Sequence, residues 1–379
     1  MSSSVVDLDD PGAVEAADPQ GMLRAVASSA AQVREGAVLA REAGVARIAD
    51  GGRPRAVVVC GMGGSGIAGD VLAAVAGTAS PVPVISHRGF GLPAWVGAGD
   101  VVLAASCSGT TEETLSAVEE AARRGCPLLA VGAENSPLHQ RAQQGRAVFV
   151  RVTQGRQPRA SIWSLSTPLL LAGSALGLCA AGDDVVESVA VALEDVALRC
   201  RIDAEALVNP AKALAGALAG ALPVVWGTSP LTGVAAYRFA CQLNENANTP
   251  ASWGALPEAG HNQVVALDGP FAGRPAAQDD DDLFRDRADD VDGGRLVLVL
   301  LRDNEEDPRV AARADAVTAL AEDRGVPVQA VRTEGASAFE RLARLVALGD
   351  YASTYLAVAQ GTDPTPVDAI TALKSAVSR

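Results

Sequence analysis

The sequence contains few histidines and no long uninterrupted apolar run, and each shortage excludes a class of protein. Three scattered histidines cannot supply the ligands of a catalytic zinc ion. The most apolar stretch, 165–181, is interrupted by Ser, Thr, Pro and Gly, so it predicts a core helix and not a membrane span. The N-terminus is polar and acidic and has no basic segment, so no signal peptide is expected.

The six cysteines show no C-x-x-C spacing, which argues against a metal or redox motif. We interpret them as small buried hydrophobic side chains in a reducing compartment, and we expect a cytoplasmic protein. The formal net charge is −14, so the surface should repel nucleic acid and anionic membranes, and neither is an expected partner. An anionic substrate would therefore need a local positive pocket, built from helix ends and a few arginines.

The 379 residues are enough for two domains with filled cores. Short apolar runs alternate with helical patterns and the alternation restarts near residue 210, which predicts two parallel sheets with helices on both faces. The predicted strands are 55–60, 82–86, 101–105, 128–131, 147–150, 223–226, 263–267, 296–301 and 326–331. The predicted helices are 66–76, 111–124, 137–144, 165–179, 184–200, 210–221, 233–244 and 339–360, with an amphipathic segment at 22–49 and a last helix ending near Lys374.

We therefore predict an α/β protein of two tandem doubly wound, flavodoxin-like domains, each a parallel sheet flanked by helices. An N-terminal helical segment, 1–50, begins with about 20 frayed residues. The first domain and its bridging helices cover 51–200, the second domain 201–360, and a C-terminal tail helix 361–379. The acidic run within 269–294 is interpreted as a solvated insert without chemistry.

The first predicted strand ends in a glycine-rich turn, Gly61-Met62-Gly63-Gly64-Ser65-Gly66, and a helical pattern follows directly. Such a turn directs free backbone N–H groups at one spot, and the helix dipole adds partial positive charge there. Gly63 and Gly64 permit a close approach, and the Ser65 hydroxyl can add a donor. The turn therefore predicts a site for an anion, most often a phosphate.

The same glycines also satisfy G-x-G-x-x-G, the dinucleotide-binding fingerprint. That fingerprint requires an acidic residue at the end of the second strand, whereas Ser86-His87-Arg88 stands there. Arg88 could hold a 2′-phosphate, so an NADP site stays open as an alternative, as does a purely structural turn. A Walker site is excluded because no Lys-Ser/Thr pair follows the glycines.

A second predicted strand-to-helix turn carries four hydroxyls and a glycine within 106–111. An ordinary N-cap on Thr110 or Thr111 is the structural alternative, but a cap needs one hydroxyl. Four hydroxyls suit the three oxygens of a phosphate, each of which takes two or more donors. The two turns together predict a phosphate site formed by Gly63, Gly64, Ser65, Ser106, Ser108 and Thr111.

Strand–GMGGSGI–helix followed by strand–S-x-S-G-x-T–helix resembles the sugar isomerase (SIS) domain, which binds phosphorylated sugars. From about Val57 to Lys374 the chain is similar to the bifunctional phosphoglucose/phosphomannose isomerase family. Besides the two turns, three patches carry this resemblance: QPRA at 157–160; LNEN at 243–246 with PEAGHN at 257–262; and DPTPV at 363–367 with LK at 373–374.

The resemblance implies an aldose–ketose isomerase of carbohydrate metabolism (glycolysis and gluconeogenesis), which interconverts glucose 6-phosphate with fructose 6-phosphate through a cis-enediol. Mannose 6-phosphate is an optional further substrate. One carboxylate can move a proton between C2 and C1, a cation can stabilise the oxyanion, and no metal or cofactor is required. By resemblance, Glu245 is this base, His261 opens the sugar ring, Arg159 steadies the enediolate, and Lys374 lies near the sugar ring.

The resemblance also implies a homodimer in which His261 reaches the active site of the neighbouring subunit. The chain departs from the family pattern at Asn248, where lysine is frequent, and at Gln263, where glutamate is frequent. Two alternatives stay open: a phosphosugar-binding SIS module without turnover, and another SIS enzyme such as a phosphosugar lyase or the isomerase half of an amidotransferase. The second alternative is weaker, because the sequence has no N-terminal cysteine nucleophile and no lysine at the usual Schiff-base position.

Overall fold

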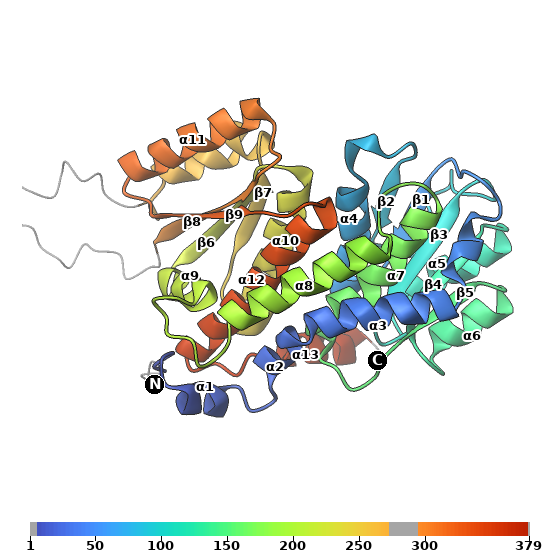
Figure 1. Ribbon diagram of the computed structural model, residues 1–379, viewed down its shortest axis with the longest axis horizontal. Helices are drawn as coiled ribbons and strands as arrows, with labels where there is room; N and C mark the ends of the chain where they lie inside the picture. Colours follow the sequence, from blue (N-terminus) through green and yellow to red (C-terminus); the bar gives the residue numbers. More distant parts are fainter. Residues whose placement is uncertain (1–5, 273–294, 378–379) are drawn as a thin grey trace, which may run out of the picture. The chain divides into compact units, whose positions relative to one another are not determined.

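The computed structural model describes residues 6–272 and 295–377 and contains two separate parallel sheets (Figure 1). It divides into two compact units. We call Arg24–Asp195 with Gly335–Arg344 the N-terminal unit, and Met1–Leu23, Val196–Glu334 and Leu345–Arg379 the C-terminal unit. The predicted class of two tandem doubly wound α/β domains is confirmed, whereas the finer boundaries within the chain stay a prediction.

The sheet of the N-terminal unit has five parallel strands in the order β2-β1-β3-β4-β5. They are β1 (Val57–Cys60), β2 (Val84–His87), β3 (Val101–Ser106), β4 (Leu128–Ala133) and β5 (Val148–Val152). Every residue of β1, β3 and β4 is buried, whereas the edge strands β2 and β5 are partly exposed. This burial explains why the three central strands consist almost entirely of apolar residues, since helices cover both of their faces.

Helices cover the two faces of this sheet in different sets (Figure 1). On one face, α5 (Glu112–Arg123) and α6 (Pro137–Gln144) share a hydrophobic core with the strands, in which Val58 and Val102 join Leu115 and Leu138. On the other face of the sheet, where the Val59 side chain lies, α4 (Gly63–Ala76) passes so close to the strands that a Cβ on Gly69 would lie 2.9 Å from the Val59 Cβ. There α4 packs on α7 (Ile162–Ala175), and α7 packs on α3 (Ser29–Glu42).

The sheet of the C-terminal unit has four parallel strands in the order β7-β6-β8-β9. They are β6 (Leu222–Gly227), β7 (Ser252–Ala255), β8 (Leu296–Asp303) and β9 (Val328–Thr333). The helix α10 (Pro230–Ala247) contacts β6, β7 and β8. A core that includes Trp226, Leu298 and Val317 joins the sheet to α11 (Pro308–Asp323).

The remaining helices of the chain include several that the sequence predicted. Asn209 caps α9 (Pro210–Leu218), since its Oδ1 accepts hydrogen bonds from the N–H groups of Ala211 and Lys212. The others are α1 (Pro11–Ala17), α2 (Met22–Ala27), α8 (Asp183–Arg199), α12 (Ala338–Ala359) and α13 (Asp368–Val377).

Several predicted elements were wrong. Residues 11–17 are not frayed, because Asp10 accepts two backbone hydrogen bonds and caps α1. The predicted strand 263–267 is a 3₁₀ helix, η5 (Gln263–Asp268), and the strand beside β6 is instead β7. Neither β7 nor α11 has a counterpart among the predicted elements. Most of the predicted acidic insert, 273–294, lies outside the described residues.

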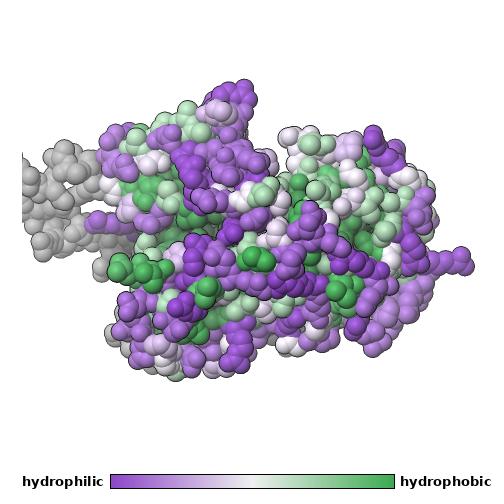
Figure 2. Space-filling view, in the orientation of Figure 1, coloured by the Kyte–Doolittle hydropathy of each residue, from purple (hydrophilic) through white to green (hydrophobic). Residues whose placement is uncertain are grey.

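The face of the molecule drawn in Figure 2 is mainly hydrophilic, with separate hydrophobic spots. Exposed apolar side chains on α8 and in the segment before α9 are Val191, Leu198, Leu207 and Val208. Across the two described ranges, no helix combines the length and apolarity needed to cross a membrane.

Candidate active site

Two turns meet at the carboxyl ends of β1 and β3 in the N-terminal unit. In a doubly wound sheet of this strand order, ligands bind between these two strands, where the chain leaves toward opposite faces. The glycine turn leads from β1 into α4, and the hydroxyl turn leads from β3 into α5. The Cys107 N–H donates a hydrogen bond of 3.3 Å to the Ser65 Oγ, so the two predicted phosphate turns are in contact.

The hydroxyls of the second turn bond to one another. Ser106 Oγ and Thr111 Oγ1 are 3.0 Å apart, and Ser108 Oγ and Thr110 Oγ1 are 2.9 Å apart. Thr111 is the N-cap residue of α5, but its side chain makes no capping bond, so the N-cap interpretation of this residue was wrong. Thr110 was absent from the predicted site, although the run of four hydroxyls was the signal that could have included it.

The helix that follows the glycine turn also begins without a side-chain cap, since Met62 stands at the N-cap of α4. The first N–H groups of a helix have no partner within the helix and need a cap, water or a ligand. At both α4 and α5 no capping side chain takes these groups, which is the condition in which a helix start binds an anion.

The glycines of the first turn serve different purposes. A Cβ on Gly61 would lie 2.8 Å from the Ser65 carbonyl oxygen and 3.0 Å from that of Ala105, so the close approach of the two turns requires a glycine there. Gly63 has a φ of +53°, in the left-handed region that favours glycine. Around Gly64, by contrast, no atom of the described residues lies within 4 Å of an added Cβ, which leaves room for a ligand.

The corresponding turn of the second sheet is closed. After β6, Ser229 and Thr232 form a capping box at the start of α10. The Ser229 hydroxyl also donates to Asp303 Oδ2 at 3.1 Å, and Asp303 is 3% exposed at the end of β8. A buried carboxylate and a filled cap disfavour an anion there. The two sheets therefore differ at equivalent places, and the hydroxyl-lined turns of the N-terminal unit are the candidate phosphate site.

Arg159 belongs to the same unit as these turns. It lies half-buried in the 3₁₀ helix η3 (Pro158–Ala160), which follows the carboxyl end of β5 and precedes α7. Parallel strands end at one edge of a sheet, so Arg159 follows the same edge as the phosphate turns.

Glu245 lies half-buried in the last turn of α10, one residue beyond the end of the predicted helix 233–244. The helix ends because Asn248 adopts a left-handed conformation with φ of +49°, which asparagine tolerates better than most residues. Asn248, where lysine is frequent in the family, is therefore the C-cap residue of α10.

Buried polar contacts fix α10 against α12. The Arg238 guanidinium donates to both oxygens of Asp350, at 2.9 and 2.7 Å, and both side chains are at most 3% exposed. Two turns later, Asn246 Nδ2 donates to Ser353 Oγ at 3.0 Å. Burial raises the pKa of Asp350, and the Arg238 guanidinium acts in the opposite direction. These contacts set the rotation of α10 about its axis, and hence the side to which Glu245 projects.

His261 is exposed at the end of η4 (Glu258–His261). Next to it, Asn262 Nδ2 donates to Glu258 Oε1 at 2.8 Å, so Glu258 anchors this loop. Gln263, the second departure, accepts from the Trp226 indole at 2.8 Å and donates to the Trp253 carbonyl at 3.2 Å. Its amide can make both bonds, whereas a carboxylate could only accept.

Lys374 is exposed on α13, as are all the side chains of that helix through residue 377. Glu245, His261 and Lys374 thus lie on three elements of the C-terminal unit, whereas Arg159 and the phosphate turns lie in the N-terminal unit. The other two histidines make contacts within the N-terminal unit: His87 hydrogen-bonds the Gly91 carbonyl at 3.0 Å, and His139 stacks on Phe149.

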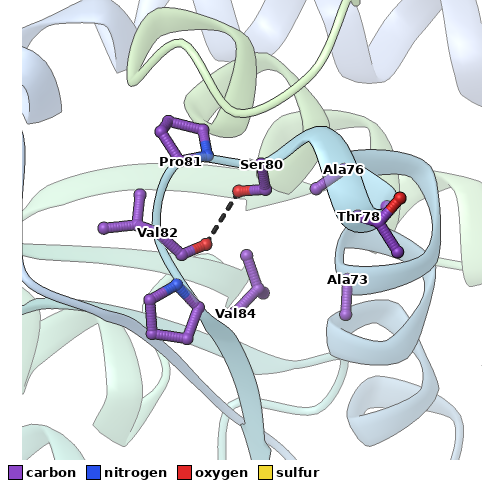
Figure 3. A pocket seen from close by; sticks show the side chains of 9 residues that line it. Ala73, Ala76, Thr78, Ser80, Pro81, Val82 and Val84 are labelled. Atoms are coloured by element: carbon purple, nitrogen blue, oxygen red, sulfur yellow. Dashed lines mark hydrogen bonds between the residues drawn. The ribbon is translucent and has the colours of Figure 1, made fainter.

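A hollow of about 350 Å³ lies elsewhere on the N-terminal unit, between the end of α4 and the start of β2 (Figure 3). The Ser80 hydroxyl in this hollow donates a hydrogen bond of 2.7 Å to the Val82 carbonyl, so the partner of this donor is a group of the chain itself. The start of β2 is at the edge of the sheet opposite the phosphate turns, and this hollow is therefore separate from the candidate site. Its lining residues are Ala73, Ala76, Gly77, Thr78, Ser80, Pro81, Val82, Pro83 and Val84.

The two parallel sheets, with two contacting strand-to-helix turns on the first, define the class of two-domain SIS proteins. Solved structures share this fold: a hypothetical protein from Thermus thermophilus has a TM-score of 0.68 at 14% identity, with 96% of this chain and 94% of that chain covered. A glucose-6-phosphate isomerase from Chlamydia trachomatis has a TM-score of 0.66 at 13% identity, with 93% and 77% covered. A family model described as the bacterial phospho-glucose isomerase C-terminal SIS domain matches residues 207–377.

Sequence relatives define the family within this class. A bifunctional phosphoglucose/phosphomannose isomerase from Caldicellulosiruptor bescii is 33% identical, over 84% of this chain and 88% of that protein. Another from Aquifex aeolicus is 32% identical, over 86% and 91%. The chain belongs to the bifunctional phosphoglucose/phosphomannose isomerase family.

Proposed function

We propose that the protein interconverts glucose 6-phosphate, and also mannose 6-phosphate, with fructose 6-phosphate. The observation that carries this proposal is the pair of uncapped helix starts lined by hydroxyls, in a chain 33% identical to a bifunctional phosphoglucose/phosphomannose isomerase over 84% of its length. The open turn offers a phosphate several neutral donors and two helix dipoles, which suits an anion on a chain of net charge −14.

The phosphate is held by the two turns of the N-terminal unit. Backbone N–H groups at Gly63 and Gly64 bind it together with the hydroxyls of Ser65, Ser106, Ser108 and Thr111. Each hydroxyl now bonded to a neighbour can rotate to donate to a phosphate oxygen, because a hydroxyl donates and accepts at once. Because only the phosphate group is bound by these turns, C1 and C2 of the sugar stay accessible to the catalytic residues.

The isomerisation is a proton transfer between two carbons. Glu245 removes the C2 proton of the open-chain aldose, and the electron pair of that C–H bond forms the C1–C2 double bond of the enediolate. The same carboxyl group then returns a proton to C1, while the proton of the C2 hydroxyl passes to the C1 oxygen, so that C2 becomes the carbonyl carbon of the ketose. Arg159 stabilises the negative charge that develops on the carbonyl oxygen.

His261 and Lys374 act on the sugar ring. His261 exchanges a proton with the ring oxygen to open the cyclic form, and Lys374 binds near the ring. Because His261 is exposed on the described chain, we propose a homodimer in which it serves the site of the partner subunit. A phosphorylated substrate and six cysteines present as thiols, all of them in the described ranges, fit a cytoplasmic enzyme.

A coupled assay with each hexose 6-phosphate tests the proposal. We expect fructose 6-phosphate to form from glucose 6-phosphate and from mannose 6-phosphate in the presence of a chelator. A protein whose melting temperature rises with fructose 6-phosphate, but which forms no product from any of these substrates, would instead be a phosphosugar-binding module.

A further inference from the structure

The helix α3 turns two polar side chains toward the segment 153–161, which follows β5 and carries Arg159. Gln32 is 1% exposed, so its amide is taken out of water and needs partners within the protein. Its Nε2 donates to the Ala160 carbonyl at 2.7 Å, next in sequence to Arg159. Its Oε1 lies 3.4 Å from both the N–H and the hydroxyl of Ser164, at the start of α7.

Glu35, three residues further along α3, holds the other end of the same segment. The Thr153 hydroxyl donates to Glu35 Oε1 at 2.5 Å, and Arg156 Nη1 lies 2.5 Å from Glu35 Oε2. Burial raises the pKa of Glu35, but the bonds from Thr153 and Arg156 outweigh it, so the pKa lies below its ordinary value. Glu35 is thus a carboxylate at neutral pH and keeps both partners.

The contacts close into a ring around the segment. Arg156 Nη1 also reaches the Ser164 Oγ at 3.4 Å, and Ser164 in turn reaches Gln32. Inside the segment, the Gln157 carbonyl accepts from the Ala160 N–H at 3.0 Å and from the Ser161 hydroxyl at 2.8 Å. The turn that carries Arg159 is therefore internally closed, and Gln32 and Glu35 fasten its two ends to α3.

We propose that Gln32 and Glu35 are positioning residues of the isomerase reaction, which hold the Arg159 turn where its guanidinium meets the enediolate. The inference rests on the proposed function, because it takes the role of Arg159 from there. Electrostatic stabilisation depends on donors that are already in place, and a displacement of about 1 Å can cost about 100-fold in rate. Loss of the anchor should therefore lower kcat more than it weakens substrate binding, since the phosphate turns are untouched.

The test is a double-mutant cycle in the coupled assay on the full chain. Gln32→Met keeps the length of the side chain and removes its amide, Arg159→Met removes the guanidinium, and the third protein carries both changes. Gln140→Met, an exposed glutamine on α6 of the same unit, is the matched control. Glu35→Gln weakens the attachment at the other end of the turn, and it replaces Gln32→Met in the cycle if Gln32→Met does not fold.

We expect Gln32→Met to lower kcat by at least tenfold with KM for fructose 6-phosphate changed less than threefold, and Gln140→Met to change neither. In the Arg159→Met background the same substitution should lower kcat less than twofold, because no guanidinium is left to position. An equal loss of kcat in both backgrounds, or an unchanged kcat in Gln32→Met, overturns the inference and leaves the proposed function intact. No turnover in the wild-type protein, or full turnover in Arg159→Met, overturns the proposed role of Arg159 and this inference with it.

Discussion

The Ser65 hydroxyl accepts a hydrogen bond of 3.3 Å from the Cys107 N–H, across 42 residues of sequence. This contact joins the turn after β1 to the turn after β3. Together the two turns bring two uncapped helix starts and a set of hydroxyls to one edge of the sheet, where we propose that the phosphate binds. Substitutions at this contact should therefore affect substrate binding more than folding.

Ser65→Ala should lower kcat/KM for fructose 6-phosphate about 10- to 100-fold, because a hydrogen bond to a charged group contributes about 1.5–3 kcal/mol. Ser229→Ala, at the equivalent place in the second sheet, is the matched control. It removes a helix cap, so it should lower the free energy of unfolding by about 0.5–2 kcal/mol and leave KM unchanged. If both variants raise KM equally, the phosphate does not bind at the first sheet alone.

Gly64→Ala tests the open space beside the glycine turn. An added methyl group meets no atom of the described residues, so the fold should tolerate it, as it should tolerate Gly216→Ala in α9. Both changes favour the helix by about 0.5–1 kcal/mol. Only Gly64→Ala should raise KM, by about tenfold, because the methyl group takes up space that the phosphate needs. Steady-state kinetics and thermal melting of the two variants give the comparison; an unchanged KM in Gly64→Ala would place the phosphate elsewhere.

Local signals made the central strands and the two strand-to-helix turns that follow β1 and β3 predictable from the sequence. The strand Val57–Cys60 is buried throughout and is therefore apolar throughout, and the turn residues follow it directly. The prediction failed at 263–267, where the apolar Val265 is exposed and the Gln263 amide bonds two tryptophan residues. The strand Ser252–Ala255 was missed because it is a short, half-exposed edge strand that contains a glycine.

The parts of the site that depend on distant residues could not be predicted in this way. Gln32 and Ala160 are 128 residues apart, and no pattern around either residue indicates their contact. The same holds for Arg238 and Asp350, which are 112 residues apart and which set the rotation of the helix that carries Glu245. Periodicity predicts which face of a helix is buried, but not which partner that face meets.

Asp350→Asn should destabilise the protein strongly. It leaves the buried Arg238 guanidinium without its carboxylate, and breaking a buried ion pair in this way costs about 3–5 kcal/mol. The double variant Arg238→Met/Asp350→Leu removes both charges and should lose less stability than the single change. Urea unfolding measures both. A loss below about 1 kcal/mol in the single variant would show that the pair does not hold α10 on α12.

Asp307 at the start of α11 should make stability depend on pH in the acid range. The Arg309 side chain and then its backbone N–H lower the pKa of Asp307 from 3.8 to about 2. A lowered pKa in the folded state means that the stabilisation is present above about pH 4 and is lost as the pH falls toward 2. Asp307→Asn keeps the cap but not the charge. Its melting temperature should therefore lie below that of the wild type at pH 5 and equal it near pH 2; a constant difference would contradict the assignment.

The most direct test of the account is proton NMR of each hexose 6-phosphate with the protein in D₂O, for the wild type and Glu245→Gln. We predict that the wild type forms fructose 6-phosphate and introduces deuterium at C2 of the aldose, because the carboxyl group that carries the proton exchanges with solvent. We predict that Glu245→Gln lowers the rate of both processes by about 10²–10⁴-fold, the usual contribution of a general base, with binding of fructose 6-phosphate retained. Deuterium exchange in Glu245→Gln at more than about a tenth of the wild-type rate would contradict the role of Glu245 as the base.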